Sequence, residues 1–129
     1  MAIFFIGIAK PQEASKNISE SNIASLKKEL SEAVDAASPT RMRRAYKSVV
    51  RDAEKLLKSF PSAPNRYQVL SIVFQSQKRL LAQEKSERNL NDLLETCKKL
   101  ASAPDKYAAL RLEADLMLSE KELSAKDAT

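Results

Sequence analysis

Apolar residues recur through most of the chain three or four positions apart, which is the spacing of one face of an α-helix. The pattern is interrupted at Pro39, at Pro61, around residue 86 and at residues 101–104. We therefore predict an all-α fold of about five helices, near 19–37, 40–59, 63–85, 87–101 and 103–123. These helices form one domain over residues 19–129, and an apolar tail at residues 1–18 precedes them.

The third predicted helix differs from the others because apolar residues occur on more than one of its sides. Ile72, Val73 and Phe74 are consecutive, whereas the other helices each carry a single apolar stripe. We therefore expect the third helix to lie at the centre of the domain. Ser62 is expected to cap its start, with Pro64 in the first turn, where the missing N–H of proline has no cost.

Two of the helix breaks repeat each other, SFPSAPNRY at residues 59–67 and KLASAPDKY at residues 99–107. Residues 52–74 and 92–114 are identical at seven of twenty-three positions. The identical pairs are Asp52/Asp92, Lys58/Lys98, Ser62/Ser102, Ala63/Ala103, Pro64/Pro104, Tyr67/Tyr107 and Leu70/Leu110. A helix, a turn and a second helix therefore recur as a unit, and such units bury their apolar faces by stacking on one another.

The first copy resembles the tetratricopeptide repeat (TPR), in which a terminal proline precedes an aromatic residue, a leucine, a small residue and a second aromatic residue. The matching residues are Pro61, Tyr67, Leu70, Ser71 and Phe74. The second copy retains the tyrosine and the leucine, but has Ala101, Arg111 and Ala114 at the other three positions. Its period of forty residues is also longer than the 34 residues of a TPR.

The resemblance covers roughly residues 49–123 and implies a TPR-like right-handed α-solenoid of antiparallel helical hairpins that acts as a protein–protein interaction scaffold. In such arrays the first helix of each hairpin lines a concave surface that holds a peptide. On the resemblance, these are the third and fifth helices. Their candidate contact residues are Gln68, Ser71, Gln75, Lys78, Arg111 and Asp115. An irregular antiparallel helical bundle is the alternative architecture.

The net charge of +5 comes from one segment, because residues 41–58 contain seven basic and two acidic residues and the rest of the chain is neutral. Five of the basic residues recur three or four positions apart and so line one edge of the second helix. This basic stripe consists of Arg44, Lys47, Arg51, Lys55 and Lys58. It is either a solvated helix face or a docking site for an acidic protein, a phosphate-rich polymer or a membrane surface.

Nucleic acid fits the basic stripe less well than an acidic protein does. Tyr46 is the only aromatic residue near the stripe, and the sequence has no recognised DNA-reading motif. A basic helical bundle that binds nucleic acid or another polyanion is therefore the second hypothesis, after the protein-interaction module.

The composition argues against an enzyme and against a bound cofactor or metal. Gly7 is the only glycine, so a glycine-rich phosphate loop cannot form, and the lack of histidine removes Ser–His and Cys–His nucleophile pairs. Cys97 is the only cysteine and falls on an apolar stripe, which favours a core position. Glu29 and Glu32 have helical spacing among basic residues, and we expect them on a solvated face rather than in an acid–base pair.

The first nine residues, MAIFFIGIA, form the most apolar run of the chain. The run has no basic residue before it and is far too short to span a bilayer. The sequence leaves open a shortened export signal, an altered terminus or a packing element, and with them a cytoplasmic or an exported location. We expect such a tail to bind an apolar groove, on its own fold or on a neighbouring chain.

The fifth predicted helix has no repeat partner after it. Complete helical arrays end on a helix with a polar outer face. We therefore expect either that the natural protein continues beyond this sequence or that a second copy covers the helix. A homodimer formed through the apolar tail or through this last helix is the assembly that follows from these features.

Overall fold

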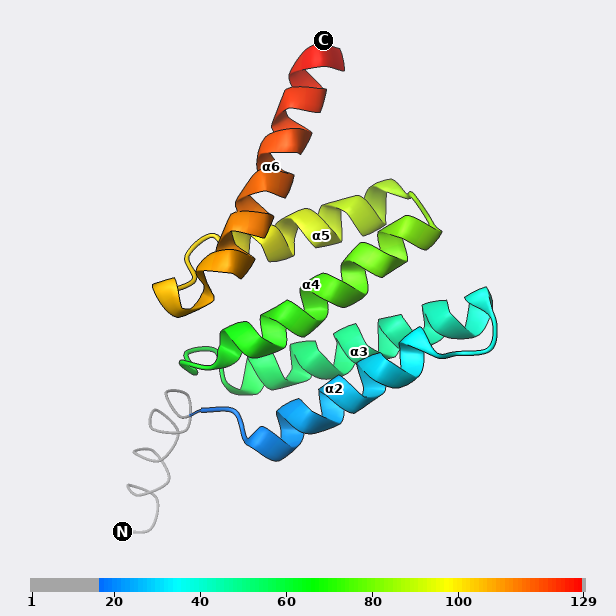
Figure 1. The fold of residues 1–129 in the computed structure, drawn as a ribbon, viewed down its shortest axis with the longest axis vertical. Coiled ribbons are helices and arrows are strands. Elements are labelled where there is room, and N and C mark those ends of the chain that lie inside the picture. The colour runs from blue at the N-terminus through cyan, green and yellow to red at the C-terminus, as the bar shows by residue number, and fades with distance from the viewer. Residues whose placement is uncertain (1–16, 129) are drawn as a thin grey trace.

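Five α-helices follow one another along residues 17–128, the part of the chain that the computed structural model describes. They are α2 (Glu20–Val34), α3 (Pro39–Ser59), α4 (Arg66–Gln83), α5 (Glu87–Leu100) and α6 (Ala108–Ala128), with a short 3₁₀ helix, η1 (Asp105–Tyr107), before α6. Each helix packs against the next, and α2 also packs against α4 (Figure 1). Residues 17–128 contain no strand, so the predicted all-α fold with about five helices is confirmed for them.

Serine side chains define the start of three helices. A serine hydroxyl at the N-cap satisfies a backbone N–H that has no partner within the helix, which stabilises a helix by about 1 kcal/mol. Pro39 occupies the first position of α3, where the helix has no use for its missing N–H. The three serine caps are Ser19, which accepts from the Asn22 N–H, Ser38, which accepts from the Arg41 N–H, and Ser86, which accepts from the Asn89 N–H.

The start of α4 differs from the prediction. Ser62 and Pro64 lie in turns before the helix, and Asn65 holds the N-cap position without a side-chain bond to the helix. The Asn65 side chain instead binds the backbone of Ile18: its amide oxygen accepts from the Ile18 N–H at 2.8 Å, and its NH₂ group donates to the Ile18 carbonyl at 2.9 Å. The Asn65 side chain therefore binds a residue distant in sequence instead of capping α4.

The start of α6 also differs from the prediction. Ser102 does not cap a helix, because its hydroxyl donates to the Lys99 carbonyl of the preceding helix end. Pro104 precedes η1, and α6 begins only at Ala108.

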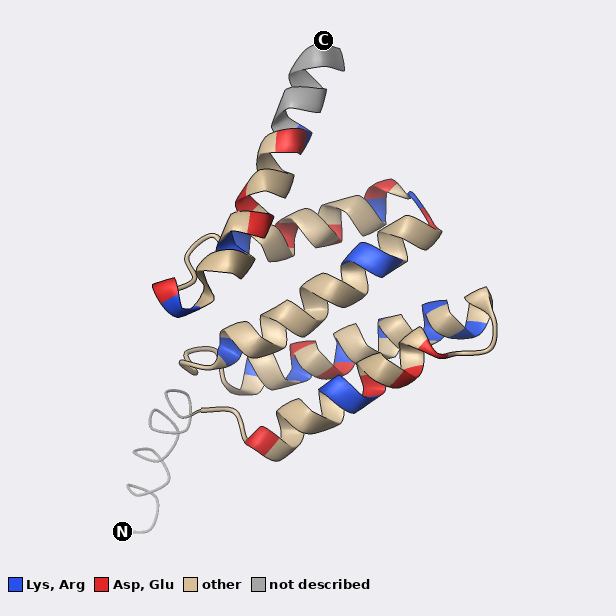
Figure 2. Ribbon diagram, viewed as in Figure 1, with Lys and Arg blue, Asp and Glu red and all other residues tan. Residues whose placement is uncertain are grey.

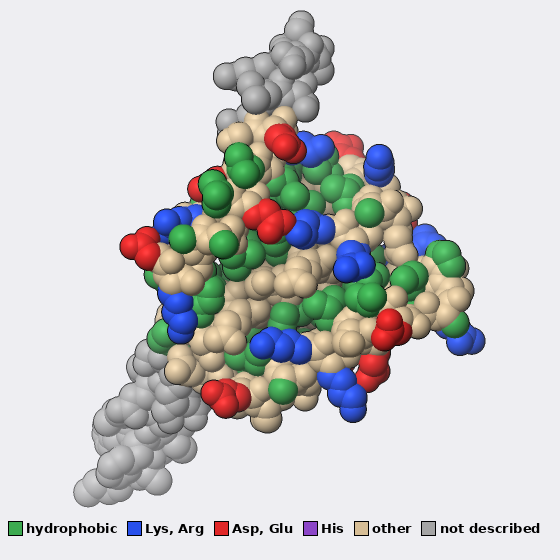
Figure 3. Space-filling model, in the orientation of Figure 1, with side chains coloured by type: hydrophobic (Ala, Val, Ile, Leu, Met, Phe, Trp, Pro, Cys, Tyr) green, Lys and Arg blue, Asp and Glu red, His purple; other side chains and the backbone are tan. Residues whose placement is uncertain are grey.

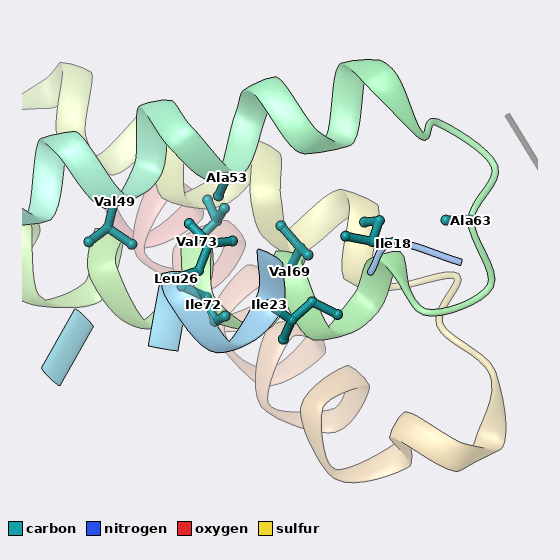
Figure 4. Close-up of a cluster of buried hydrophobic side chains, with 9 residues drawn as sticks. All are labelled: Ile18, Ile23, Leu26, Val49, Ala53, Ala63, Val69, Ile72 and Val73. Carbon is teal, nitrogen blue, oxygen red and sulfur yellow. The ribbon is translucent and has the colours of Figure 1, made fainter. Parts of the chain in front are cut away.

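Two layers of buried apolar side chains lie on either side of α4. The first packs α2, α3 and α4 together, with Leu26, Ala53 and Val73 each no more than 3% exposed (Figure 4). The second packs α4 against α5 and α6, and includes Phe74 and Leu93. Because α4 contributes to both layers, its prediction as the central helix is confirmed.

Ile18 belongs to the first layer, although the sequence pattern assigned it to the tail. It is 1% exposed and lies among side chains of the α2–α4 layer (Figure 4). The two hydrogen bonds from Asn65 satisfy its backbone groups, so burial of this extended residue leaves no polar group unpaired. Residues 1–16 of the predicted tail lie outside the described residues.

Two side chains on neighbouring helices are more buried than the sequence suggested. Tyr46 was expected beside the basic stripe but is 1% exposed, on the face of α3 that meets α2 and α4. Glu29 was expected to be solvated but is half-buried, and one of its carboxylate oxygens is buried without a hydrogen-bond partner among the described residues. Both residues fit the helical spacing, but Tyr46 is buried because α2 and α4 pack on it, and Glu29 because α3 lies beside it.

Candidate functional site

A depression of about 660 Å³ lies between α2, α4 and α6. Its apolar lining comes from all three helices and from η1, and Figure 3 shows hydrophobic side chains gathered over this part of the surface with basic side chains among them. The lining residues include Leu30 and Val34 of α2, Tyr67 and Ile72 of α4, Tyr107 of η1, and Ala109 and Leu110 of α6. Depressions of this size are typical of sites for small ligands or peptide side chains.

Two further depressions continue this one along α4. One of about 640 Å³ starts at Asn17 and shares Lys27, Gln68, Lys106 and Tyr107 with it. The other, of about 460 Å³, shares Ser71, Gln75 and Leu110 and extends toward Lys78 and Arg79. Together the three form one hollow along the exposed side of α4, which we call the central groove.

The tyrosines at residues 67 and 107 form part of the wall of the central groove. Their ring centroids are 5.4 Å apart with the planes tilted by 43°, within the range of favourable aromatic pairs. The Arg66 guanidinium lies 4.5 Å from the centre of the Tyr67 ring. This cluster fixes η1 against the start of α4 and so fixes the distance between α4 and α6 at this end of the groove.

The charge at the edge of the central groove is basic. Lys27 of α2 and Lys106 of η1 line two of its depressions, and neither forms an ion pair with a described residue. Lys78, farther along α4, is paired with Glu113 of α6 at 2.5 Å. The groove therefore combines an apolar lining with two exposed ammonium groups that are available to an acidic ligand.

Three residues predicted to contact a peptide lie together in the central groove. Gln68, Ser71 and Gln75 follow one face of α4 at helical spacing and line the depression between α2 and α6. Gln75 donates a hydrogen bond to the Ser71 hydroxyl at 3.2 Å. Lys78 lines the adjoining depression, where it forms the ion pair with Glu113.

The two candidate residues of α6 lie elsewhere. Arg111 binds the preceding turn, since its guanidinium donates to the Ala103 carbonyl at 2.8 Å and to the Asp105 carboxylate at 3.3 Å. Asp115 is exposed and does not line any of the three depressions of the central groove. Arg111 holds the turn between α5 and α6, a role that the sequence pattern did not indicate.

The basic stripe is exposed along its whole length on α3. None of Arg44, Lys47, Arg51, Lys55 and Lys58 is buried. Lys47 and Arg51 line a separate depression of about 510 Å³, which also contains Arg88 and the carboxylates of Glu54, Glu84 and Asp92. Figure 2 shows acidic residues beside basic ones on these helices. In this depression the two residues of the stripe therefore lie beside three carboxylates, which reduces the attraction of the stripe for a polyanion.

Sequence reasoning missed the contribution of α2 to the central groove. Lys27, Leu30 and Val34 lie outside the repeated segment, so the repeat could not point to them. Their spacing of three and four residues places them along one side of α2. This spacing could have indicated that α2 lines a groove, but the same spacing also predicts a helix face that packs in the core.

Cys97 lies in the core, where its thiol is buried. Burial, and to a lesser extent the nearby Glu113 carboxylate, raise the pKa of the Cys97 thiol to about 11, so the thiol is protonated at neutral pH. Within residues 17–128, no group of three histidine, cysteine, aspartate or glutamate side chains is placed to hold a metal ion. No helix of this part is long and apolar enough to cross a membrane.

Comparison with protein-family models, with curated proteins and with solved structures gives no significant match. The function therefore has to be inferred from the central groove and the basic stripe.

Proposed function

We propose that the protein is a non-catalytic interaction module whose central groove binds an apolar peptide segment that carries acidic residues. The observation that supports this is the depression between α2, α4 and α6, which joins apolar side chains of three helices to Gln68, Ser71 and Gln75. Amphipathic helices and extended peptides bind such grooves by inserting apolar side chains, while polar groups at the edge fix their orientation.

The charge of the groove suggests which peptides it prefers. Lys27 of α2 and Lys106 of η1 both line the depression beside its apolar side chains. A carboxylate placed near either ammonium group gains an ion pair that no described residue supplies. A peptide with an apolar centre and acidic flanks therefore fits better than a basic or a purely polar one, and complementary charge also speeds association.

We further propose that α3–α4 and α5–α6 are two TPR-like hairpins of a right-handed solenoid that belongs to a larger protein. Ala63 and Ala103 occur forty residues apart, and each is buried in the turn between the helices of its hairpin. Superposing residues 49–74 on 89–114 in an experimental structure tests the proposal. Hairpins that fail to overlay within a few ångströms would instead indicate an irregular bundle.

The groove proposal is tested with peptides selected from a display library against the full chain. A peptide selected on the native protein is then measured by fluorescence anisotropy against Gln75→Glu and Gln83→Glu. Both glutamines are exposed on α4, but only Gln75 lines the central groove. Because a carboxylate in the groove repels an acidic peptide, we expect Gln75→Glu to raise Kd at least about tenfold, the equivalent of about 1.4 kcal/mol, and Gln83→Glu to leave it within about twofold.

Equal loss or equal retention of binding by the two variants would contradict a site in the groove. Circular dichroism of both proteins shows whether the substitution at Gln75 has altered the fold. Selected peptides without apolar residues would contradict the inferred ligand chemistry.

Binding of nucleic acid or another polyanion is the second candidate, because five basic side chains are exposed along α3. Changing Arg44, Lys47 and Arg51 to Glu would abolish such binding. Polyanion binding falls steeply as salt rises, because counterions are released from the phosphates. Measurements at low and high salt with the native and the charge-reversed protein would separate this function from peptide binding, which depends less on salt.

A further inference from the structure

We infer that a second copy of this chain is a ligand of the central groove, and that the exposed side of α6 is the part that enters the groove. This partner rests on the proposed function, because it would bind the same groove. The exposed side of α6 lies opposite the buried Ala114, and we call it the outer face of α6. It consists of five exposed residues, Leu112, Asp115, Leu116, Ser119 and Glu120.

The outer face of α6 carries the apolar side chains that the central groove favours. Leu112 and Leu116 are 59% and 56% exposed and lie one turn apart. Amphipathic helices bind apolar grooves by inserting side chains at this spacing. Burial of the two leucines against the apolar lining of the depression between α2, α4 and α6 removes them from water, which favours association.

The charges of the two surfaces are complementary. Asp115 and Glu120 lie on the outer face beside the leucines, and neither forms an ion pair with a described residue. Lys27 and Lys106 of the groove also lack an ion pair with a described residue. The outer face of α6 therefore has the apolar centre and the acidic groups that the proposed ligand requires.

The two surfaces also match in length. Along α4 the groove extends from Gln68 to Arg79, which corresponds to about 16 Å of helix at 1.5 Å per residue. The outer face extends from Leu112 to Glu120, which corresponds to about 12 Å. The groove can therefore hold the whole outer face.

The positions of the two surfaces suit a symmetric dimer. Hydrophobic side chains on α6 and over the groove appear on the same face of the molecule (Figure 3). Within one chain the outer face cannot enter the groove, because the other side of α6 is packed against α5 through Met117 and Leu118. Two copies related by a two-fold axis can each place α6 in the groove of the other, so that the contact forms twice.

Reversal of charge on each surface tests this dimer in the full chain. The groove variant carries Lys27→Glu with Lys106→Glu, and the helix variant carries Asp115→Lys with Glu120→Lys. The swapped variant carries all four substitutions, so it keeps the native net charge and restores opposite charges across the contact.

A matched control separates the contact from the change in net charge. Lys55→Glu with Lys85→Glu changes the net charge by the same amount as the groove variant. Both lysines are exposed, on α3 and in the loop after α4, and neither lines the central groove. Circular dichroism shows whether any variant has altered the fold.

The measurement is the dissociation constant of the dimer, from sedimentation equilibrium at several protein concentrations. We expect the groove variant and the helix variant each to raise this constant at least about tenfold, because like charges then face each other in the contact. The control and the swapped variant should stay within about threefold of the native protein.

Three outcomes would overturn the inference. The first is a native protein that remains monomeric at all concentrations. The second is a dimer that Leu112→Lys with Leu116→Lys weakens but the groove variant does not, since α6 would then contact another surface. The third is a swapped variant that fails to recover association. The proposed function is judged separately by the Gln75→Glu peptide assay, run at protein concentrations below the dissociation constant of the dimer.

Discussion

At the scale of single residues, Glu29 shows how packing changes a side chain that its local sequence presents as ordinary. Burial raises the pKa of its carboxyl, and the neighbouring Asp52 and Glu32 carboxylates raise it further, while Arg51 lowers it. The helical spacing of the sequence predicted correctly that Glu29 lies on α2. It did not predict that α3 and its Asp52 lie beside Glu29 and exclude water from it. The charged form of the Glu29 carboxyl is therefore less stable in the folded protein than in the unfolded chain.

We predict that Glu29→Gln becomes more stable, relative to the native protein, as the pH rises. Because the pKa of Glu29 is raised in the folded state, the folded protein holds this proton more tightly than the unfolded chain does. Its contribution is fully present below the ordinary pKa of a glutamate and is lost as pH rises through the raised value. The free energy of unfolding of Glu29→Gln, minus that of the native protein, should therefore be larger at pH 7 than at pH 4. Urea unfolding at both pH values measures this gain.

The control for this prediction is Glu54→Gln, because Glu54 is exposed on α3 and is not among the groups that shift the pKa of Glu29. The difference between Glu54→Gln and the native protein should change little over the same range. A stability difference for Glu29→Gln that shrinks as pH rises would contradict the assigned direction of the pKa shift.

At the scale of helices, residues forty positions apart in α4 and α6 have similar burial on one side of the two helices and different burial on the other. Tyr67 and Tyr107 meet in one aromatic pair, and Phe74 and its counterpart Ala114 are both fully buried. Ile72, however, is 3% exposed, whereas its counterpart Leu112 is 59% exposed. The reason is that α2 and α3 cover one side of α4, and no described helix covers the corresponding side of α6.

We predict that the two tyrosines of the repeat differ in their contributions to stability. Tyr67 is 6% exposed and lies in the layer between α4, α5 and α6, so Tyr67→Ala should cost about 3–5 kcal/mol. Tyr107 is only half-buried, so Tyr107→Ala should cost less, on the order of 1.5–3 kcal/mol. Denaturant unfolding of both variants gives the comparison. A cost below about 0.5 kcal/mol for Tyr67→Ala would show that the residue is not part of the core.

At the scale of the whole molecule, α6 presents an apolar surface that the described chain leaves uncovered. Leu112 and Leu116 are 59% and 56% exposed and lie four residues apart, on the same face of the helix. The predicted homodimer through the last helix would use this face, and a further helix of a longer protein would cover the same residues. The homodimer through the tail depends on residues 1–16, which lie outside the described part.

We predict that Leu112→Lys combined with Leu116→Lys shifts the protein toward the monomer without unfolding it. Substitution of exposed residues usually changes the free energy of unfolding of a monomer by less than about 0.5 kcal/mol. A dimer formed through this face would bury both leucines, so placing two charges there would weaken the dimer. Sedimentation at several protein concentrations measures the mass, and Gln83→Lys combined with Asn91→Lys, at exposed positions of α4 and α5, controls for the two added charges. An unchanged mass distribution would contradict self-association through α6.

The sequence by itself determined the features that depend on neighbouring residues. The helical spacing of apolar residues and the prolines at 39 and 61 predicted five helices and the four breaks between them, because both act within one or two turns of chain. The repeat pointed to Gln68, Ser71 and Gln75 as one exposed face of the third predicted helix, and they line one groove. Each of these inferences needs only the period of a helix and the chemistry of its ends.

Only the tertiary structure decided which distant segments meet. It placed Ile18 in the core through Asn65, assigned Arg111 to the turn before α6, and brought Lys27 of α2 to the same groove as Lys106. Partners of this kind lie from eight to almost eighty residues away along the sequence. Helical periodicity gives the face on which a residue lies, but the side chains that cover that face are set by the packing of whole helices.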